Sequence, residues 1–209
     1  MPVDLRRLSV VPMLAVVALG VAACGSSSSS TTSSASSAST ATSTTASASA
    51  SVPVVGKSTS VVVNPATAQA LKQAGITITP VAPATAHTVL LFPVSGGQVV
   101  VATLAGTIEH SGGLILSHGG KSVQLTSFTV DTSTKQLTAL VAGQRVPIFE
   151  LNLASLKRAT GPNGTVIASD IKMTLTAQAA TALNSALGLS TFVPGLPFGV
   201  ATVTVAVKT

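Results

Sequence analysis

Tyrosine and tryptophan are absent from this chain of 209 residues, and phenylalanine occurs only 5 times. Charged side chains make up 8% of the residues, against roughly 25% in a typical soluble domain. The formal charge is +6 at pH 7, but the basic residues are scattered along the chain rather than clustered. Because the chain has neither a basic patch nor an aromatic platform on which bases could stack, we expect no binding to nucleic acid.

Cysteine is nearly absent as well, since Cys24 is the single thiol of the chain. A lone thiol has no partner for a disulfide within the chain. It follows an uncharged stretch of apolar or small residues, 8–23, which Arg6 and Arg7 precede. A short positive start and an apolar run of this length predict a signal peptide over residues 1–23 rather than a permanent transmembrane helix.

The four residues that end this segment, Val21 to Cys24, read VAAC. They resemble the lipobox of bacterial lipoproteins, in which an aliphatic residue and two small residues precede a cysteine. The resemblance implies cleavage between Ala23 and Cys24 and attachment of a diacylglyceryl group to the Cys24 thiol. Two or three acyl chains hold a protein stably on a membrane, whereas one binds only marginally. We therefore expect a lipoprotein anchored through Cys24 to the extracytoplasmic face of the cell membrane.

Residues 26–51 consist entirely of serine, threonine and alanine. Such a segment has no large apolar groups to offset the entropy lost on ordering, so we predict a disordered tether over residues 24–51. A flexible coil of about thirty residues spans roughly 30 Å root-mean-square. The tether would hold the rest of the chain away from the membrane, in the periplasm or the cell wall.

Residues 52–209 are enough for a single domain with a hydrophobic core and are short for two. They contain many short stretches rich in valine, isoleucine, leucine and threonine, and several of these alternate as strands do. Glycine pairs at 96–97, 112–113 and 119–120, together with GPNG at 161–164, predict the turns. We predict a mainly β domain, either a β-sandwich or an open barrel-like arrangement of antiparallel sheets.

Two alanine-rich segments carry helical signals instead. In residues 64–75, Asn64 suits an N-cap, Pro65 suits the first turn, and a glycine closes the segment. Residues 175–188 have leucines spaced four apart in an alanine-rich frame and also end on a glycine. We therefore predict two short helices within the β domain.

The three histidines are the natural candidates for a ligand site. If Ser111–Gly113 formed a hairpin turn, His110 and His118 would lie on one face of the sheet about 13 Å apart, at 3.3 Å per residue. One metal ion cannot bridge that distance, because nitrogen ligands lie within about 2.1 Å of zinc. His87 lies in a polar connection. We therefore predict no metal site.

The sequence has no recognisable set of catalytic residues. It has no G-x-S-x-G nucleophile elbow, and Glu109 would point to the opposite face of a strand from His110, where it could not orient the imidazole. A hydrolase would have to use Glu150 and Asp170, which carry no local signature, and Glu150 suits an ion pair with Arg145. We expect no enzymatic activity, with a cell-wall hydrolase as the second alternative function.

An ordered series of motifs does resemble a known family. LAGTIEHSGGLILSHGGKSVQLTSFTVD is followed by VPIFELNL, IKMTLTAQAATAL and GLPFGVATVTV. Over roughly residues 92–207 this series resembles the HtaA domain, a β-rich module of actinobacterial cell-envelope proteins associated with haem uptake. The resemblance implies an HtaA-like fold for residues 52–209.

The same resemblance draws attention to His110. Haem-binding members of that family use a tyrosine as the iron ligand, with a histidine nearby, and His110 falls where the family has its histidine before a glycine turn. This chain has no tyrosine. Met173, another residue type that can serve as an axial ligand, lies on a strand beside Ile171 and Leu175 and is expected in the core. Haem ligation would therefore rest on His110 alone.

The leading hypothesis from the sequence is a non-catalytic binding or structural module of the cell envelope. It would need no cofactor, and its partner would be a cell-wall component or another envelope protein. The alternative, implied by the HtaA resemblance, is a haem-binding or haem-relay lipoprotein centred on His110.

The lipid anchor gives a direct prediction. Replacing Cys24 with serine removes the thiol, and a hydroxyl cannot form the thioether, so Cys24→Ser should abolish incorporation of a labelled fatty acid into the chain in growing cells. The matched control Ser26→Ala should be labelled as fully as the original chain. Label that persists in Cys24→Ser would contradict the anchor.

Overall fold

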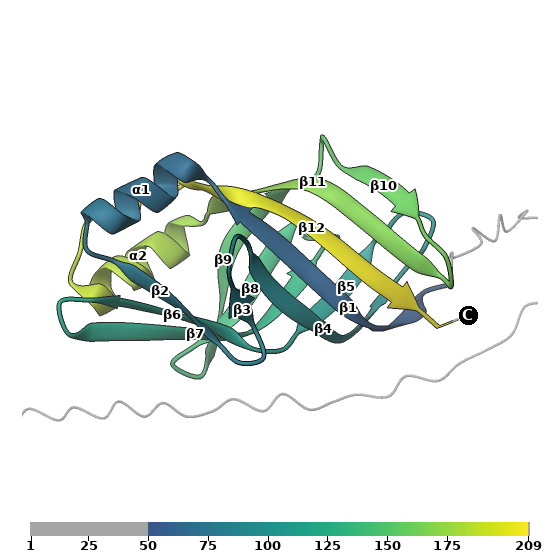
Figure 1. The fold of residues 1–209 in the computed structure, drawn as a ribbon, viewed down its shortest axis with the longest axis horizontal. Helices are drawn as coiled ribbons and strands as arrows, with labels where there is room; N and C mark the ends of the chain where they lie inside the picture. Colours follow the sequence, from purple (N-terminus) through teal and green to yellow (C-terminus); the bar gives the residue numbers. More distant parts are fainter. Residues whose placement is uncertain (1–49, 209) are drawn as a thin grey trace, which may run out of the picture. The chain divides into compact units, whose positions relative to one another are not determined.

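The computed structural model describes residues 50–208, so the predicted signal peptide, Ala23, Cys24 and the predicted tether up to residue 49 lie outside the described residues. Within residues 50–208 the chain is mainly β, with two helices (Figure 1). The strands are β1 (Val52–Val63), β2 (Thr77–Val81), β3 (Thr85–Ala86), β4 (Leu90–Val99), β5 (Gly106–His110), β6 (Gly113–His118), β7 (Lys121–Asp131), β8 (Gln136–Val141), β9 (Gln144–Asn152), β10 (Lys157–Thr160), β11 (Thr165–Leu175) and β12 (Pro197–Val207). The helices are α1 (Pro65–Gln73) and α2 (Ala177–Leu187).

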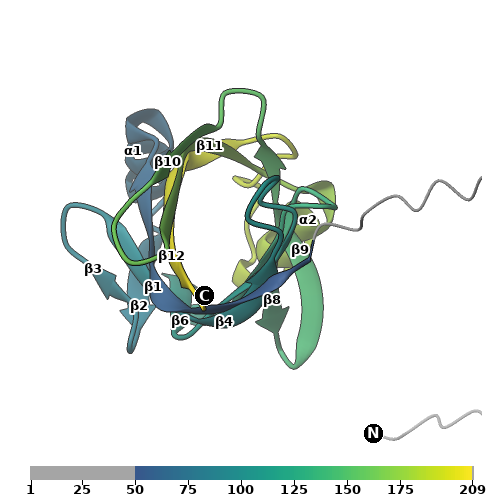
Figure 2. The same cartoon turned by 90° about the vertical axis from the view of Figure 1, so that its right-hand side faces the viewer.

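The strands close into an antiparallel barrel. Its order is β7-β5-β4-β1-β12-β11-β9-β8, and β8 pairs with β7 to complete the ring. Figure 2 looks along this ring, with β1, β4, β8, β9, β11 and β12 around its circumference. Outside the ring, β6 and β2 extend the sheet, β3 pairs with β4, and β10 pairs with β11. The predicted fold class is confirmed, in its barrel form.

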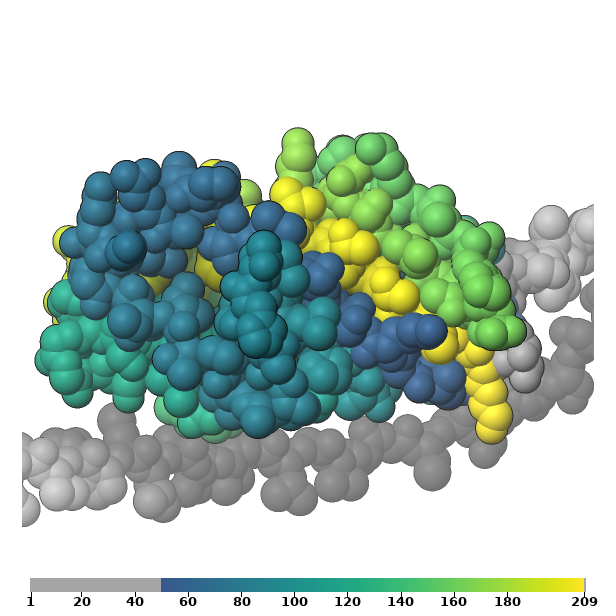
Figure 3. Space-filling view, viewed as in Figure 1, coloured from purple at the N-terminus to yellow at the C-terminus, as the bar shows by residue number. Residues whose placement is uncertain are grey.

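The alternation in the sequence decides which side chains face the interior of the barrel. Along β12, Ala201, Val203 and Val205 are each 3% exposed and point inward, whereas the threonines between them are partly exposed. Side chains on a strand alternate between its two faces, so a period of two in hydrophobicity gives one buried face. On the outer surface β1 and β12 lie side by side (Figure 3), and there Val62 pairs with Val200.

The turn predicted at Gly112 and Gly113 is wrong, and the pairing of β7 with its neighbours shows why. β5 and β6 pair with the same edge of β7, one after the other, with Glu109 opposite Thr129 and Gly113 opposite Thr126. They therefore run in the same direction, and residues 111–112 are a break between them rather than a hairpin turn.

Two of the other predicted turns are confirmed and one is wrong. Gly119 and Gly120 join β6 to β7, and residues 161–164 join β10 to β11. The pair Gly96 and Gly97 lies inside β4 instead, paired with β5. Glycine there permits a close approach of two strands, which is a use of glycine that resembles a turn signal in sequence.

Both predicted helices are present, and they lie together at one end of the barrel (Figure 1). The Asn64 side chain accepts a hydrogen bond from the backbone N–H of Ala66 at 2.9 Å and so caps α1. Thr176 caps α2 in the same way, and α2 ends at Gly188 in the left-handed conformation. Neither helix within residues 50–208 has the length and apolar character needed to cross a membrane.

The close approach of β4 and β5 gives a stability prediction. Gly106 has a φ of 144°, and a Cβ there would overlap the carbonyl oxygen of Gln98 on β4. Gly106→Ala should therefore lower the free energy of unfolding by about 2 kcal/mol or more. The control Gly161→Ala places its Cβ 3.4 Å from Thr165 and should change it far less. Urea unfolding of both variants measures the difference. An equal loss of unfolding free energy in the two variants would contradict the close pairing of β4 with β5 at Gly106.

Candidate functional site

His110 lies at the end of β5 with its imidazole inside the barrel wall, 5% exposed. Its Nδ1 lies 3.2 Å from the backbone carbonyl oxygen of Phe128 on β7. Its Nε2 lies 2.6 Å from Oγ1 of Thr59 on β1. Both ring nitrogens therefore have hydrogen-bonding partners, and the ring links three strands of the barrel.

The carbonyl of Phe128 is available to His110 because β7 is irregular at that point. The register between β7 and β8 shifts between Thr126 and Thr129, and Ser127 has a φ of 51°. A bulge of this kind leaves backbone groups outside the ladder, and a buried carbonyl then needs another donor. The N–H of the His110 imidazole supplies it.

These partners fix the tautomer of the neutral His110 ring. A carbonyl only accepts hydrogen bonds, so Nδ1 carries a proton, and in the neutral ring Nε2 accepts from the Thr59 hydroxyl. Burial lowers the pKa of His110 from 6.5 to about 4, because an imidazolium would lose its hydration, and the hydrogen bond to Phe128 opposes this only in part. His110 is therefore neutral at pH 7.

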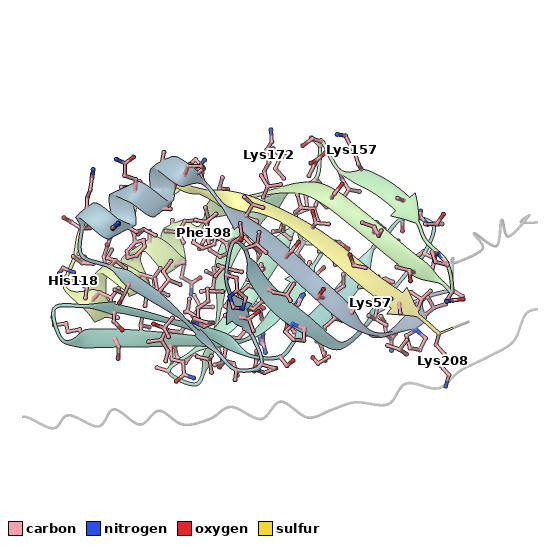
Figure 4. The ribbon with its side chains drawn as sticks, viewed as in Figure 1. Lys57, His118, Lys157, Lys172, Phe198 and Lys208 are labelled. Atoms are coloured by element: carbon pink, nitrogen blue, oxygen red, sulfur yellow. The ribbon has the colours of Figure 1, made fainter. Side chains whose placement is uncertain are left out.

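The other two histidines are elsewhere. His118 ends β6 beneath the helices (Figure 4), at the far end of the sheet extension from His110. His87 is exposed in the connection between β3 and β4. Because β5 and β6 run in line rather than as a hairpin, His110 and His118 lie farther apart than the 13 Å expected from a hairpin. No group of three or more histidine, cysteine, aspartate or glutamate side chains within residues 50–208 is placed to hold a metal ion.

The surroundings of His110 do not fit a haem. Binding iron through either nitrogen would break the hydrogen bond to Thr59 or to Phe128. The cavity beside the ring measures only about 30 Å³ and is lined by packed side chains such as Phe92 and Phe128, which lie edge to face. The hydroxyl next to His110 is that of Thr59, and an alcohol is not among the usual axial donors to haem iron. Met173 is 2% exposed, as expected of a core residue.

The candidate carboxylates are separated. Glu150 is exposed on β9 opposite Thr174, which is four positions along β11 from Asp170, about 13 Å at 3.3 Å per residue. The carboxyl pairs of glycosidases lie about 5–9.5 Å apart. Asp170 binds Lys157 at 2.8 Å.

The expected ion pair between Glu150 and Arg145 is not what the structure shows. Nη1 of Arg145 donates instead to the carbonyl oxygen of Ser127 and to the hydroxyls of Thr129 and Thr138. These contacts hold the guanidinium over the irregular part of β7, where Ser127 lies outside the regular ladder.

The sequence did not predict an apolar cavity that lies inside the barrel. Its volume is about 120 Å³, and every strand of the ring contributes to its wall. Small side chains help to leave it open, because Ala168 on β11 and Ala201 on β12 point inward where larger residues could reach across. Thr59, Leu137 and Met173 line both this cavity and the smaller one at His110, so the two spaces adjoin.

The cavity wall offers few polar groups. Thr59 has its hydroxyl directed to His110, and the Thr132 hydroxyl donates to the carbonyl oxygens of Leu104 and Gly106. The Thr103 hydroxyl oxygen accepts from the N–H of Ala105. An interior of this kind suits hydrocarbon and has no arrangement of side chains that points to covalent chemistry.

This architecture places the chain among the small eight-stranded antiparallel barrels, whose interiors are filled by side chains or hold one small ligand. Its fold is HtaA-like. The crystal structure of the C-terminal domain of HtaA from Corynebacterium glutamicum is similar, with a TM-score of 0.58 and 15% identity. The match covers 75% of this chain and 99% of that domain, and at this identity it shows the fold alone. No family model and no curated protein matches the chain.

The burial of His110 predicts a pH-dependent stability. The pKa of about 4 in the folded state lies below the 6.5 of the unfolded chain, so between these values the unfolded state binds more protons. As the pH drops from 6.5 to 4, protonation of His110 in the unfolded state should therefore lower the free energy of unfolding by about 3 kcal/mol.

Urea unfolding at pH 7 and pH 4.5 measures this loss. His110→Gln should be less stable at pH 7 but should lose less on acidification, whereas the exposed control His87→Gln should behave like the original chain. An equal loss with and without His110 would contradict its assignment as a buried neutral base.

Proposed function

We propose that this chain is a non-catalytic binding module of the cell envelope that holds a small apolar molecule inside its barrel. The observation that carries the proposal is the cavity of about 120 Å³ enclosed by the ring of strands. An apolar cavity of about 150 Å³ in another protein stays dry and takes up benzene. The cavity here is therefore suited to a hydrocarbon group of about that size.

The energetics of the empty cavity support the same function. An unfilled apolar cavity costs roughly 24 cal/mol per Å³, which is about 3 kcal/mol for this volume. A ligand that fills it recovers dispersion contacts with the wall and removes its own apolar surface from water. Barrel closure fixes the wall beforehand, so little ordering is needed when the ligand enters.

The remainder of the proposal concerns location. The VAAC sequence supports attachment of the chain through Cys24 to the extracytoplasmic face of the membrane, and the serine-rich tether supports a domain held at some distance from it. A module in this position would meet its ligand in the periplasm or cell wall, and an envelope protein could deliver or receive it. This location suits a carrier or receptor better than an enzyme.

Haem binding is the alternative that the HtaA resemblance suggests, and the bonding of His110 favours the apolar ligand over it. Both nitrogens of the imidazole are hydrogen-bonded, one to Thr59 and the other to Phe128. In the proposed function His110 is a structural residue that lines the smaller cavity and ties β5 to β1 and β7.

Benzene tests the proposal directly. Added to the full chain carrying Cys24→Ser, so that no attached lipid competes for the cavity, benzene should raise the melting temperature in a concentration-dependent way. Ala201→Leu extends a side chain into the cavity and should abolish this shift without unfolding the barrel. The matched control Ala206→Leu adds the same side chain on the outer face of the same strand and should keep the shift.

The shift in melting temperature must depend on the cavity. A shift of equal size in Ala201→Leu would place benzene elsewhere on the protein and contradict the proposal. No shift in any of the three proteins would show that the cavity is a packing defect of the core.

A further inference from the structure

The cavity opens at the end of the barrel away from the helices. Most of its wall consists of buried strand residues, but Thr103 is exposed, and Ala105, Thr132, Leu153 and Leu156 are only partly buried. These five residues lie in the connection from β4 to β5, just after β7, and in the connection from β9 to β10. The partly exposed residues of the wall therefore mark its mouth.

Arg158 lies across this mouth. On β10 it pairs with Ala168 of β11, and residues directly opposite each other on neighbouring strands point to the same face. Ala168 lines the cavity, so the Arg158 side chain leaves β10 on the cavity side. Its Nη1 donates to the carbonyl oxygen of Ala102 at 2.7 Å, which joins β10 to the connection between β4 and β5.

Within the described part of the chain, Arg158 is a cation without an ion-pair partner at this mouth. The neighbouring Lys157 is paired with Asp170, whereas Arg158 has no acidic partner among the residues that the structure describes. The carboxylate of Asp131 accepts from the N–H groups of Ser133 and Thr134. No acidic side chain lines the cavity within residues 50–208.

Two donors remain for a ligand at the mouth. A guanidinium has five N–H groups, and the Ala102 carbonyl occupies one of them. The Thr103 hydroxyl accepts a hydrogen bond from Ala105, which leaves its own proton available. An acidic group at the mouth would therefore meet a planar cation suited to carboxylate or phosphate and a hydroxyl donor beside it.

We propose that the ligand of the cavity is an anionic amphiphile, with its hydrocarbon tail inside the barrel and its acidic head bound by Arg158 at the mouth. This inference rests on the proposed function, because it requires that the cavity take up hydrocarbon. The tail passes Thr103 and ends near Thr59 and Met173, where the smaller cavity at His110 begins. The volume accommodates about as many carbons as benzene has, so a short tail is held completely and a longer one extends out of the mouth.

Four probes test the head and the tail separately: benzene, hexanol, hexanoate and hexyl phosphate. Each is titrated into the full chain carrying Cys24→Ser, and binding is measured by calorimetry or by NMR shifts of methyl groups in the cavity. Hexanoate or hexyl phosphate should bind at least about tenfold more tightly than hexanol, since a charged head adds a charge-assisted hydrogen bond. The tighter of the two anions tells whether the head is a carboxylate, as in a free fatty acid, or a phosphate, as in a lipid.

Arg158→Gln is the decisive variant. It should weaken the preferred anion by about tenfold or more and leave hexanol and benzene within about twofold. The matched control Lys157→Gln removes the adjacent cation, which faces the other way and pairs with Asp170, and should leave all four affinities nearly unchanged. Raising the salt concentration should weaken the anion more than hexanol, because the pair at the mouth is exposed to solvent.

The outcomes separate this inference from the proposed function. If benzene binds but neither anion binds better than hexanol, the acidic head is wrong and the apolar cavity stands. If Arg158→Gln weakens hexanol as much as the anion, Arg158 only supports the loop through Ala102, and the inference is again overturned. If none of the four probes binds, the proposed function itself fails.

Discussion

The pairing of β8 with β7 is the constraint on which the rest of this structure depends. It closes eight strands into a ring, so that every strand of the ring has a neighbour on both sides and all inward side chains share one enclosed space. An eight-stranded ring is just wide enough for side chains to fill its centre. This chain has no tyrosine or tryptophan to reach across, and Ala168 and Ala201 leave part of the centre empty. The cavity therefore follows from the composition of the chain, because small inward side chains do not fill the centre of the ring.

Closure also accounts for the position of His110. The strand β7 pairs with β5, β6 and β8, and it becomes irregular where its partner on one edge changes from β5 to β6. The irregularity leaves the Phe128 carbonyl without a place in the ladder, and the imidazole satisfies it from inside the barrel while accepting from Thr59. A buried side chain whose polar atoms all have hydrogen-bonding partners stabilises the fold. A histidine in this position ties β5 to β1 and β7 and so completes the wall of the barrel.

Much of the fold could be read from the sequence, and the reasons are local. The caps at Asn64 and Gly188 and the alternation along β12 act over a few residues, so both helices and the strand content were predicted. Strand pairing was less accessible, because the same glycine pair can make a turn, as at residues 119–120, or a close approach of strands, as at residues 96–97. His110 was identified, but its partners lie 51 and 18 residues away in the chain, and no local pattern names them. The cavity and the position of Arg158 at its mouth depend on ring closure and were not predicted. The inward alanines, in a chain that lacks tyrosine and tryptophan, were nevertheless a signal for the cavity.

Xenon binding in a crystal tests the central claim most directly, since xenon enters dry apolar cavities without any polar contact. Crystals of the full chain carrying Cys24→Ser would be pressurised with xenon and compared with crystals of Ala201→Leu. The account predicts one xenon site inside the ring, bounded by Leu137, Met173 and Ala201, which disappears in Ala201→Leu. A barrel interior without xenon, or xenon bound only on the outer surface, would contradict the claim that the ring encloses a ligand-sized apolar cavity.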